Sequence, residues 1–183
     1  MGSSRIGLTV EDLRDMPDDG RRYELIGGDL AVSPAPSWSH QRIVQRINRL
    51  LSRAEEMGWG QAAAAPIDVV LHPEQSAVQP DLLFIARDRL HTVRAGVVAE
   101  APDLVVEVLS DTTRRRDLGP KLHLYERHGV PFYWAVDPEE EAVRVYVRRG
   151  GGYGDPAFLR PGGLLGCPLF PAVTMPVEDV FAG

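Results

Sequence analysis

Leu104-Val105-Val106-Glu107-Val108-Leu109 is the stretch that decides the fold, because it places one carboxylate inside an otherwise apolar run. Short, continuous apolar runs of this kind are typical of strands in a sheet that is covered on both faces. Removing a carboxylate from water costs several kcal/mol unless the group is paired or binds a cation. The stretch therefore predicts a central strand, and Glu107 is expected to have a cationic partner there.

Neighbouring segments extend the sheet outward from this strand. The runs at residues 67–71 and 81–85 are also short, apolar and bounded by proline or polar residues, so both are predicted to be central strands. Residues 131–136 are predicted to pair with residues 142–147 through an acidic turn at 137–141. The sheet is therefore expected to contain both buried and hairpin-paired strands.

Two helices are predicted to cover this sheet. Residues 39–57 place apolar side chains at helical spacing on one face, and residues 119–127 form a second helix. A hairpin is expected over residues 23–32, with Glu24 on its first arm. The predicted fold class is α/β, with a mixed β-sheet flanked by α-helices.

The outer face of the helix at 39–57 carries four arginines. They fall within a sector of roughly 60° around the helix axis and are Arg42, Arg46, Arg49 and Arg53. Such a stripe is most often a solvated helix face, and the sharper interpretation is a ridge that contacts phosphates. Both interpretations stay open at this point.

Length and composition bound the molecule as a whole. The 183 residues fit one domain over 1–183, with a looser tail around the glycine-rich loops at 150–152 and 161–163. Cys167 is the only cysteine, which excludes an intrachain disulfide and favours a buried thiol. No run approaches the roughly 18 apolar residues of a membrane span, and residues 1–5 have no apolar signal core behind them. A cytoplasmic location is therefore expected.

The acidic balance of the chain limits its partners. A formal net charge of −6 argues against a protein that coats DNA, because affinity for nucleic acid comes largely from neutralising phosphates. A carboxylate metal site, however, contributes negative charge that a bound cation offsets. Any nucleic-acid contact is therefore expected to be local.

Asp81 and Lys121 are the residues that complete a chemical site with Glu107. Asp81 opens an apolar strand, where a strand end can point its carboxylate towards Glu107. Hard cations such as Mg²⁺ commonly bind one or two carboxylates together with water and substrate phosphate. Lys121, on the apolar side of its helix, can orient an attacking water or neutralise a transition state. Each residue also has a structural interpretation when it is taken singly. Asp81 could cap a strand end, Glu107 could pair with an arginine, and Lys121 could be a surface lysine.

The order of these residues resembles a known nuclease superfamily. Asp81, a strand acid and a following lysine are similar to the PD-(D/E)XK pattern, and further motifs resemble the Uma-two family of predicted restriction endonucleases. The motifs are Tyr23-Glu24-Leu25-Ile26, Ser33-Pro34, His40, Pro80-Asp81, Val105-Val106-Glu107-Val108-Leu109-Ser110, Arg116-Asp117, Lys121, Tyr125 and Gly129-Val130-Pro131-Phe132-Tyr133-Trp134. The usual Glu-x-Lys is replaced by Glu107-Val108-Leu109, so the resemblance implies that the lysine has migrated to position 121.

The resemblance implies a restriction-endonuclease-like core and a set of site residues. In that pattern Mg²⁺ or Mn²⁺ is held by Asp81, Glu107 and the backbone carbonyl of Val108. Glu24 is implied as an additional acid of the catalytic set. The implied neighbours of the site are His40 and Tyr125. A histidine on an apolar helix face is more often a packing residue, so no proton-transfer role is assigned to His40.

The predicted function is metal-dependent hydrolysis of DNA phosphodiester bonds by an endonuclease. Arg114, Arg115 and Arg116 precede the lysine helix, and they are either a solvated turn or a grip on the phosphates beside the scissile bond. Cleavage of both strands would call for two active sites and hence a homodimer. The alternative is a catalytically inactive binding or regulatory module that keeps the nuclease fold, and action on RNA stays open as a third.

Overall fold

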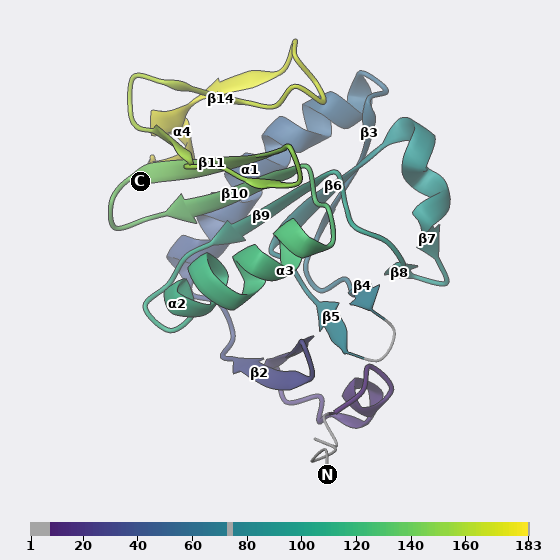
Figure 1. Cartoon of the computed structure of the whole chain (residues 1–183). Coiled ribbons are helices and arrows are strands. Elements are labelled where there is room, and N and C mark those ends of the chain that lie inside the picture. The colour runs from purple at the N-terminus through teal and green to yellow at the C-terminus, as the bar shows by residue number, and fades with distance from the viewer. Residues whose placement is uncertain (1–7, 73–74, 183) are drawn as a thin grey trace.

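A seven-stranded mixed sheet forms the centre of the computed structural model, which describes residues 8–72 and 75–182. Its strands are β3 (Gly60–Ala64), β6 (Leu82–Ala86), β9 (Leu104–Val108), β10 (Phe132–Asp137), β11 (Ala142–Arg149), β12 (Gly152–Tyr153) and β13 (Ala157–Leu159). They follow the order β12-β11-β10-β9-β6-β3, with β13 also paired to β11. Figure 1 labels the strands from β11 to β3. β9 and β10 run parallel, whereas β9 and β6 are antiparallel. The prediction that residues 1–5 do not begin a signal segment falls on residues outside the described ones.

The central strand β9 has the two covered faces that its sequence predicts. All five of its residues are buried. Alternate side chains enter two different apolar clusters, with Leu104 and Val106 in one and Val105 in the other. This alternation follows from the two-residue period of a strand. Glu107 therefore lies on the same side of the sheet as Val105.

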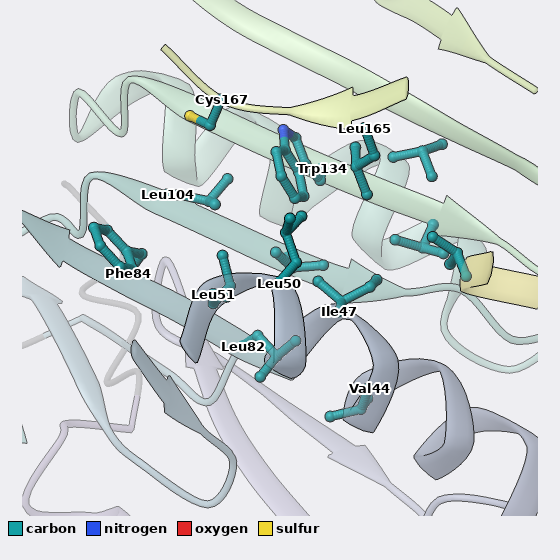
Figure 2. Packing of buried hydrophobic residues seen from close by; sticks show 14 of the residues in the cluster. Val44, Ile47, Leu50, Leu51, Leu82, Phe84, Leu104, Trp134, Leu165 and Cys167 are labelled. Atoms are coloured by element: carbon teal, nitrogen blue, oxygen red, sulfur yellow. The ribbon is translucent and has the colours of Figure 1, made fainter. Parts of the chain in front are cut away.

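Helix α1 (Trp38–Glu56) covers the Leu104 side of the sheet. Its N-terminus is capped by Ser37, whose hydroxyl accepts a hydrogen bond of 3.2 Å from the amide of His40. Figure 2 shows the buried face of α1, including Ile47 and Leu50, against side chains of the sheet such as Trp134. The predicted helix and its apolar face are confirmed.

A second helical segment covers the other side of the sheet. It consists of α2 (Arg114–Arg116), a π-helical turn at Asp117–Lys121 and α3 (Leu122–Arg127). The predicted helix at 119–127 is therefore right in place but wrong in extent, because Pro120 lies inside the wider π turn instead of opening a helix. This turn directs both Asp117 and Lys121 into the protein, where each is buried.

A six-stranded second sheet lies at one end of the first. Its order is β2-β1-β5-β4-β8-β7, and its strands are β1 (Arg22–Ile26), β2 (Asp29–Ser33), β4 (Val69–His72), β5 (Ser76–Val78), β7 (Val93–Arg94) and β8 (Val97–Val98). The predicted hairpin is β1 and β2, joined at Gly27 and Gly28 with φ of 61° and 89°. The expectation that residues 67–71 form a central strand is wrong, because β4 belongs to this second sheet. Two short 3₁₀ helices, Asp12–Asp15 and Arg87–Thr92, complete the connections.

The C-terminal segment is an integral part of the core. It contains β14 (Leu164–Gly166), β15 (Thr174–Pro176) and α4 (Val177–Phe181). Six of its residues are buried in the α1 cluster: Leu165, Cys167, Phe170, Val173, Val177 and Val180. The expected looser tail is therefore wrong, whereas the expected burial of Cys167 is confirmed.

Two arginines of the α1 stripe hold this C-terminal segment. Arg46 donates a hydrogen bond to the carbonyl of Val180 at 3.4 Å, and Arg53 donates one to the carbonyl of Thr174 at 3.2 Å. Two of the four arginines of the stripe therefore bind the C-terminal segment. Among the described helices, none has the length and hydropathy needed to cross a membrane.

Candidate active site

The register of β6 against β9 brings the two predicted acids together. Leu82 pairs with Val106 and Leu83 pairs with Val105. Continuing this antiparallel register by one residue places Asp81 opposite Glu107, on the face that α3 covers. The amide of Val108 donates a hydrogen bond of 2.8 Å to Oδ2 of Asp81. The two carboxylates therefore belong to one site.

Asp81 is buried among nitrogen donors. Its Oδ1 lies 2.9 Å from Nη1 of Arg22 and 3.2 Å from Nε2 of His40. Burial by itself would raise the pKa of Asp81, but the contacts with His40, Arg22 and the Val108 amide lower it to about 2. This carboxyl group is therefore ionised at neutral pH.

Glu107 receives its donors on a single oxygen. Its Oε1 accepts a hydrogen bond of 2.7 Å from the hydroxyl of Tyr125 and lies 2.5 Å from Nζ of Lys121. Burial raises the pKa of Glu107 above its ordinary value against the attraction of Lys121, and the neighbouring acids Asp117, Asp81 and Glu24 add to the rise. Among the described residues, none donates a hydrogen bond to its other oxygen, Oε2.

Lys121 is buried between Glu107 and Glu24. Its Nζ donates a hydrogen bond of 2.8 Å to Oε1 of Glu24, which also accepts one of 2.8 Å from the amide of Gln79. Burial opposes the charge on Lys121, but Glu107, Glu24 and Asp117 outweigh it and raise the pKa above its ordinary value. Burial also opposes the charge on Glu24, and Lys121 keeps the pKa of that acid low. The structure thus places Glu24 in contact with the predicted lysine.

The three consecutive arginines have different surroundings. Arg114 forms an ion pair with the buried carboxylate of Asp137, at 2.5 and 2.7 Å. Arg115 is exposed. Arg116 points into the site, where it donates to the hydroxyl of Ser33 at 2.5 Å and lies 3.7 Å from Oε2 of Glu24. Arg116 therefore faces the cavity, Arg115 faces solvent, and Arg114 is engaged in a structural ion pair.

A cavity of about 350 Å³ connects this site to solvent. Asp81, Glu107 and Lys121 line it together with His40 and both Arg114 and Arg116. The segment 33–40, which leads from β2 into α1, forms part of its wall. A phosphodiester group that entered this cavity would meet two carboxylates and a lysine in one place.

Sequence reasoning missed Arg22 and Asp117 as members of the site. Arg22 lies two residues before Glu24 on β1, so both side chains are on the same face of that strand. Asp117 lies four residues before Lys121 and, like it, is buried at the cavity wall. The strand period could have pointed to Arg22, whereas the inward direction of Asp117 depends on the π turn.

A second missed signal concerns residue choice. Lys121 is the only lysine among the 20 lysines and arginines of the chain. It is also one of the largest fully buried side chains in the described structure. A chain that uses arginine at every other basic position therefore keeps its one lysine inside the site.

The donor set fits a hard divalent cation that keeps part of its hydration. Asp81 and Glu107 supply carboxylate oxygens, and Oε2 of Glu107 has no protein donor among the described residues. No group of three or more His, Cys, Asp or Glu side chains within the described residues has the arrangement of a metal site. Two carboxylates are nevertheless enough protein ligands for Mg²⁺, which commonly completes its coordination with water and substrate phosphate.

The comparisons with known proteins agree with this fold. A crystal structure of "a putative nuclease belonging to DUF820" from Anabaena variabilis ATCC 29413 superposes with a TM-score of 0.79 and 19% sequence identity, covering 96% of this chain and 98% of that one. At this identity the likeness shows the fold alone, a mixed α/β fold. No curated protein matches the chain. The Uma2 family model, described as "Putative restriction endonuclease", matches residues 10–178, so the chain belongs to the Uma2 family.

Proposed function

We propose that this protein is a metal-dependent endonuclease that hydrolyses phosphodiester bonds in DNA. One observation carries the proposal: Asp81 and Glu107 face each other across β6 and β9 at the base of a solvent-connected cavity, with Nζ of Lys121 2.5 Å from Glu107. Membership of a nuclease family supports the same reaction class.

The acids are the proposed metal ligands. Asp81 and Glu107 would hold Mg²⁺ or Mn²⁺, and the backbone carbonyl of Val108 would be the third protein ligand. A bound ion of this kind supplies an activated water and positive charge for the phosphoryl oxygens. Tyr125 fixes the orientation of Glu107 through its hydrogen bond of 2.7 Å, and His40 lies against Asp81.

Lys121 acts in this scheme as a permanent cation. Its pKa is raised by three acids, so its amine stays protonated and cannot accept a proton from water. It instead donates hydrogen bonds and stabilises the charge that develops on the transferred phosphoryl group. Glu24 is a positioning residue, because its bond of 2.8 Å to Nζ holds the ammonium beside Glu107.

DNA contacts are proposed to be local. Arg115 is exposed and Arg116 lines the cavity, so both can bind phosphates close to the reacting one. Cleavage of both strands would require two such sites, which a homodimer would provide.

The proposal is tested by nicking of supercoiled DNA. The wild-type protein is expected to cut with Mg²⁺ or Mn²⁺ and to lose activity with EDTA. Asp81→Ala and Lys121→Met should each lower the rate by about 100-fold or more, the usual effect of removing one group that stabilises the transition state. Asp155→Asn, an exposed acid away from the cavity, is the matched control and should retain full activity. Equal activity in the wild type and the site variants would contradict the assignment.

A catalytically inactive binding module is the second candidate. It is favoured by one observation, namely that each oxygen of Asp81 already has a nitrogen donor, Arg22 for Oδ1 and the Val108 amide for Oδ2. Calorimetric titration with Mn²⁺ separates the two candidates. If the protein is an endonuclease, the wild type should bind Mn²⁺ and the Glu107→Ala variant should not. If it is a binding module, the wild type should show no binding heat at millimolar Mn²⁺.

A further inference from the structure

Arg22 occupies the carboxylate that the proposed metal would use. Its Nη1 lies 2.9 Å from Oδ1 of Asp81 and donates a second bond of 2.9 Å to the carbonyl of Gln79. The Arg22 side chain is 20% exposed and lines the cavity. Arg22 is therefore a further cation inside the site, in contact with Asp81.

A divalent ion on Asp81 would compete with the groups that already contact this carboxylate. Metal–oxygen distances of about 2.1 Å leave little room for donors that already lie on the same oxygens. The Val108 amide belongs to β9, which is fixed by its register with β10, and His40 is held in the first turn of α1. Arg22 has a long side chain and also carries a full positive charge that repels the ion. Arg22 is therefore the donor that leaves.

Departure from Asp81 does not leave the guanidinium without partners. The Gln79 carbonyl still accepts a bond from it. The cavity into which it opens is the space that a substrate phosphate would enter, and guanidinium groups bind phosphate oxygens strongly through paired hydrogen bonds. The Arg22 side chain thus has an anionic partner in both states: Asp81 before metal binding and a substrate phosphate after it.

We infer that Arg22 is an exchange cation: it neutralises Asp81 in the metal-free protein and, once an ion binds, moves to a DNA phosphate beside the scissile bond. This inference rests on the proposed function. It predicts opposite effects on the two ligands, because Arg22 competes with the metal but assists the DNA. A purely structural arginine would weaken both ligands when replaced.

The test compares Arg22→Gln with Arg21→Gln. Arg21 is the neighbouring arginine, with a side chain 62% exposed and paired to Asp19 outside the cavity, so it is the matched control. Mn²⁺ affinity is measured by calorimetry without DNA. Arg22→Gln should bind Mn²⁺ at least about tenfold more tightly, since one unit charge a few ångströms away is removed. Arg22→Lys should lie between, and Arg21→Gln should match the wild type.

Binding of a fluorescent DNA duplex, followed by anisotropy in Ca²⁺, gives the second readout. Arg22→Gln should bind DNA about tenfold more weakly, as expected for loss of a charge-assisted phosphate contact. An unchanged or weaker Mn²⁺ affinity, or an unchanged DNA affinity, would overturn the inference. A variant that binds Mn²⁺ more tightly and DNA more weakly, in a protein that never cuts DNA, would keep this inference and refute the endonuclease.

A measurement on the wild-type protein guards against misfolding of the variant. In crystals soaked with Mn²⁺, the contact between Arg22 and Asp81 should be broken. An ion bound between Asp81 and Glu107 with that contact still at 2.9 Å would refute the exchange.

Discussion

At the scale of single residues, the choice of lysine at position 121 has a physical reason. An ammonium group is compact and has three donors, whereas the guanidinium of arginine is a larger planar fork. Nζ of Lys121 lies between Glu24 and Glu107, at 2.8 and 2.5 Å, in a place that is 1% exposed. A point charge satisfies both acids in this small space. Among the lysine and arginine side chains in the described residues, Lys121 alone is fully buried.

Replacing Lys121 by methionine should destabilise the fold. The variant keeps most of the buried volume but leaves Glu24 and Glu107 without their cation, which costs about 3–5 kcal/mol when one partner of a buried pair is removed. Urea unfolding measures the change. Adding Glu24→Gln to Lys121→Met should restore part of the loss, because one uncompensated carboxylate is gone. Arg49→Met, on the exposed face of α1, is the control and should stay within about 0.5 kcal/mol of the wild type. If Lys121→Met and Arg49→Met lowered the free energy of unfolding by similar amounts, the ion-pair account would be refuted.

At the scale of elements, the spacing of apolar residues predicted the helices and strands that are formed by local sequence. β9, β6 and α1 lie where the apolar runs and the helical spacing put them, and the predicted meeting of Asp81 and Glu107 follows from two neighbouring strand ends. The helix before Lys121 is different. Proline favoured a helix start at Gly119, but the chain is already helical from Arg114 and widens into a π turn around Pro120. A prediction based on the 3.6-residue period of an α-helix cannot identify a π turn, although π turns are frequent at functional sites.

Close approach of β3 to β6 gives a prediction at this scale. A Cβ added at Gly60 would lie 2.1 Å from the carbonyl oxygen of Ile85 and 2.7 Å from the ring of Phe84. Gly60→Ala should therefore destabilise the protein by about 1–3 kcal/mol, the usual cost of overpacking. Thermal unfolding gives the comparison with Gly154→Ala, where an added Cβ meets nothing within 4 Å. If the two variants melt alike, the close contact has no energetic weight.

At the scale of the whole molecule, the site lies where the two sheets meet. Glu24 and Arg22 come from β1 in the second sheet, and Glu107 comes from the first. Residues 79–81 link β5 to β6 and thus cross between the sheets, with Gln79 bonded to both Glu24 and Arg22. Local pattern could not predict this, because the partners are more than 50 residues apart in the chain. For the same reason the sequence did not reveal that the C-terminal segment closes the core beside α1.

The ion pairs that join α2 to β10 and β11 should make the free energy of unfolding depend on pH. Asp137 has no exposed surface and accepts bonds from Arg114 and, at 3.2 Å, from Arg144. Burial by itself would raise the pKa of Asp137, but Arg114, the Glu140 amide and Arg144 lower it below its ordinary value. Because the unfolded chain then binds the proton more readily, this contribution is complete above the unfolded pKa of about 4 and is lost as pH falls through the lower folded pKa.

Asp137→Asn tests this dependence through urea unfolding at pH 7, 4 and 3. The variant should be about 3 kcal/mol less stable than the wild type at pH 7, since the arginines keep their charge and lose their buried partner. The difference should shrink towards pH 3, because acid protonates the wild-type carboxyl group and removes the same interaction. Asp155→Asn, at an exposed position, controls for the change in net charge and should show no difference at any of the three pH values. A difference between Asp137→Asn and the wild type that is the same at pH 7 and pH 3 would show that Asp137 stabilises the fold by packing and not by its charge.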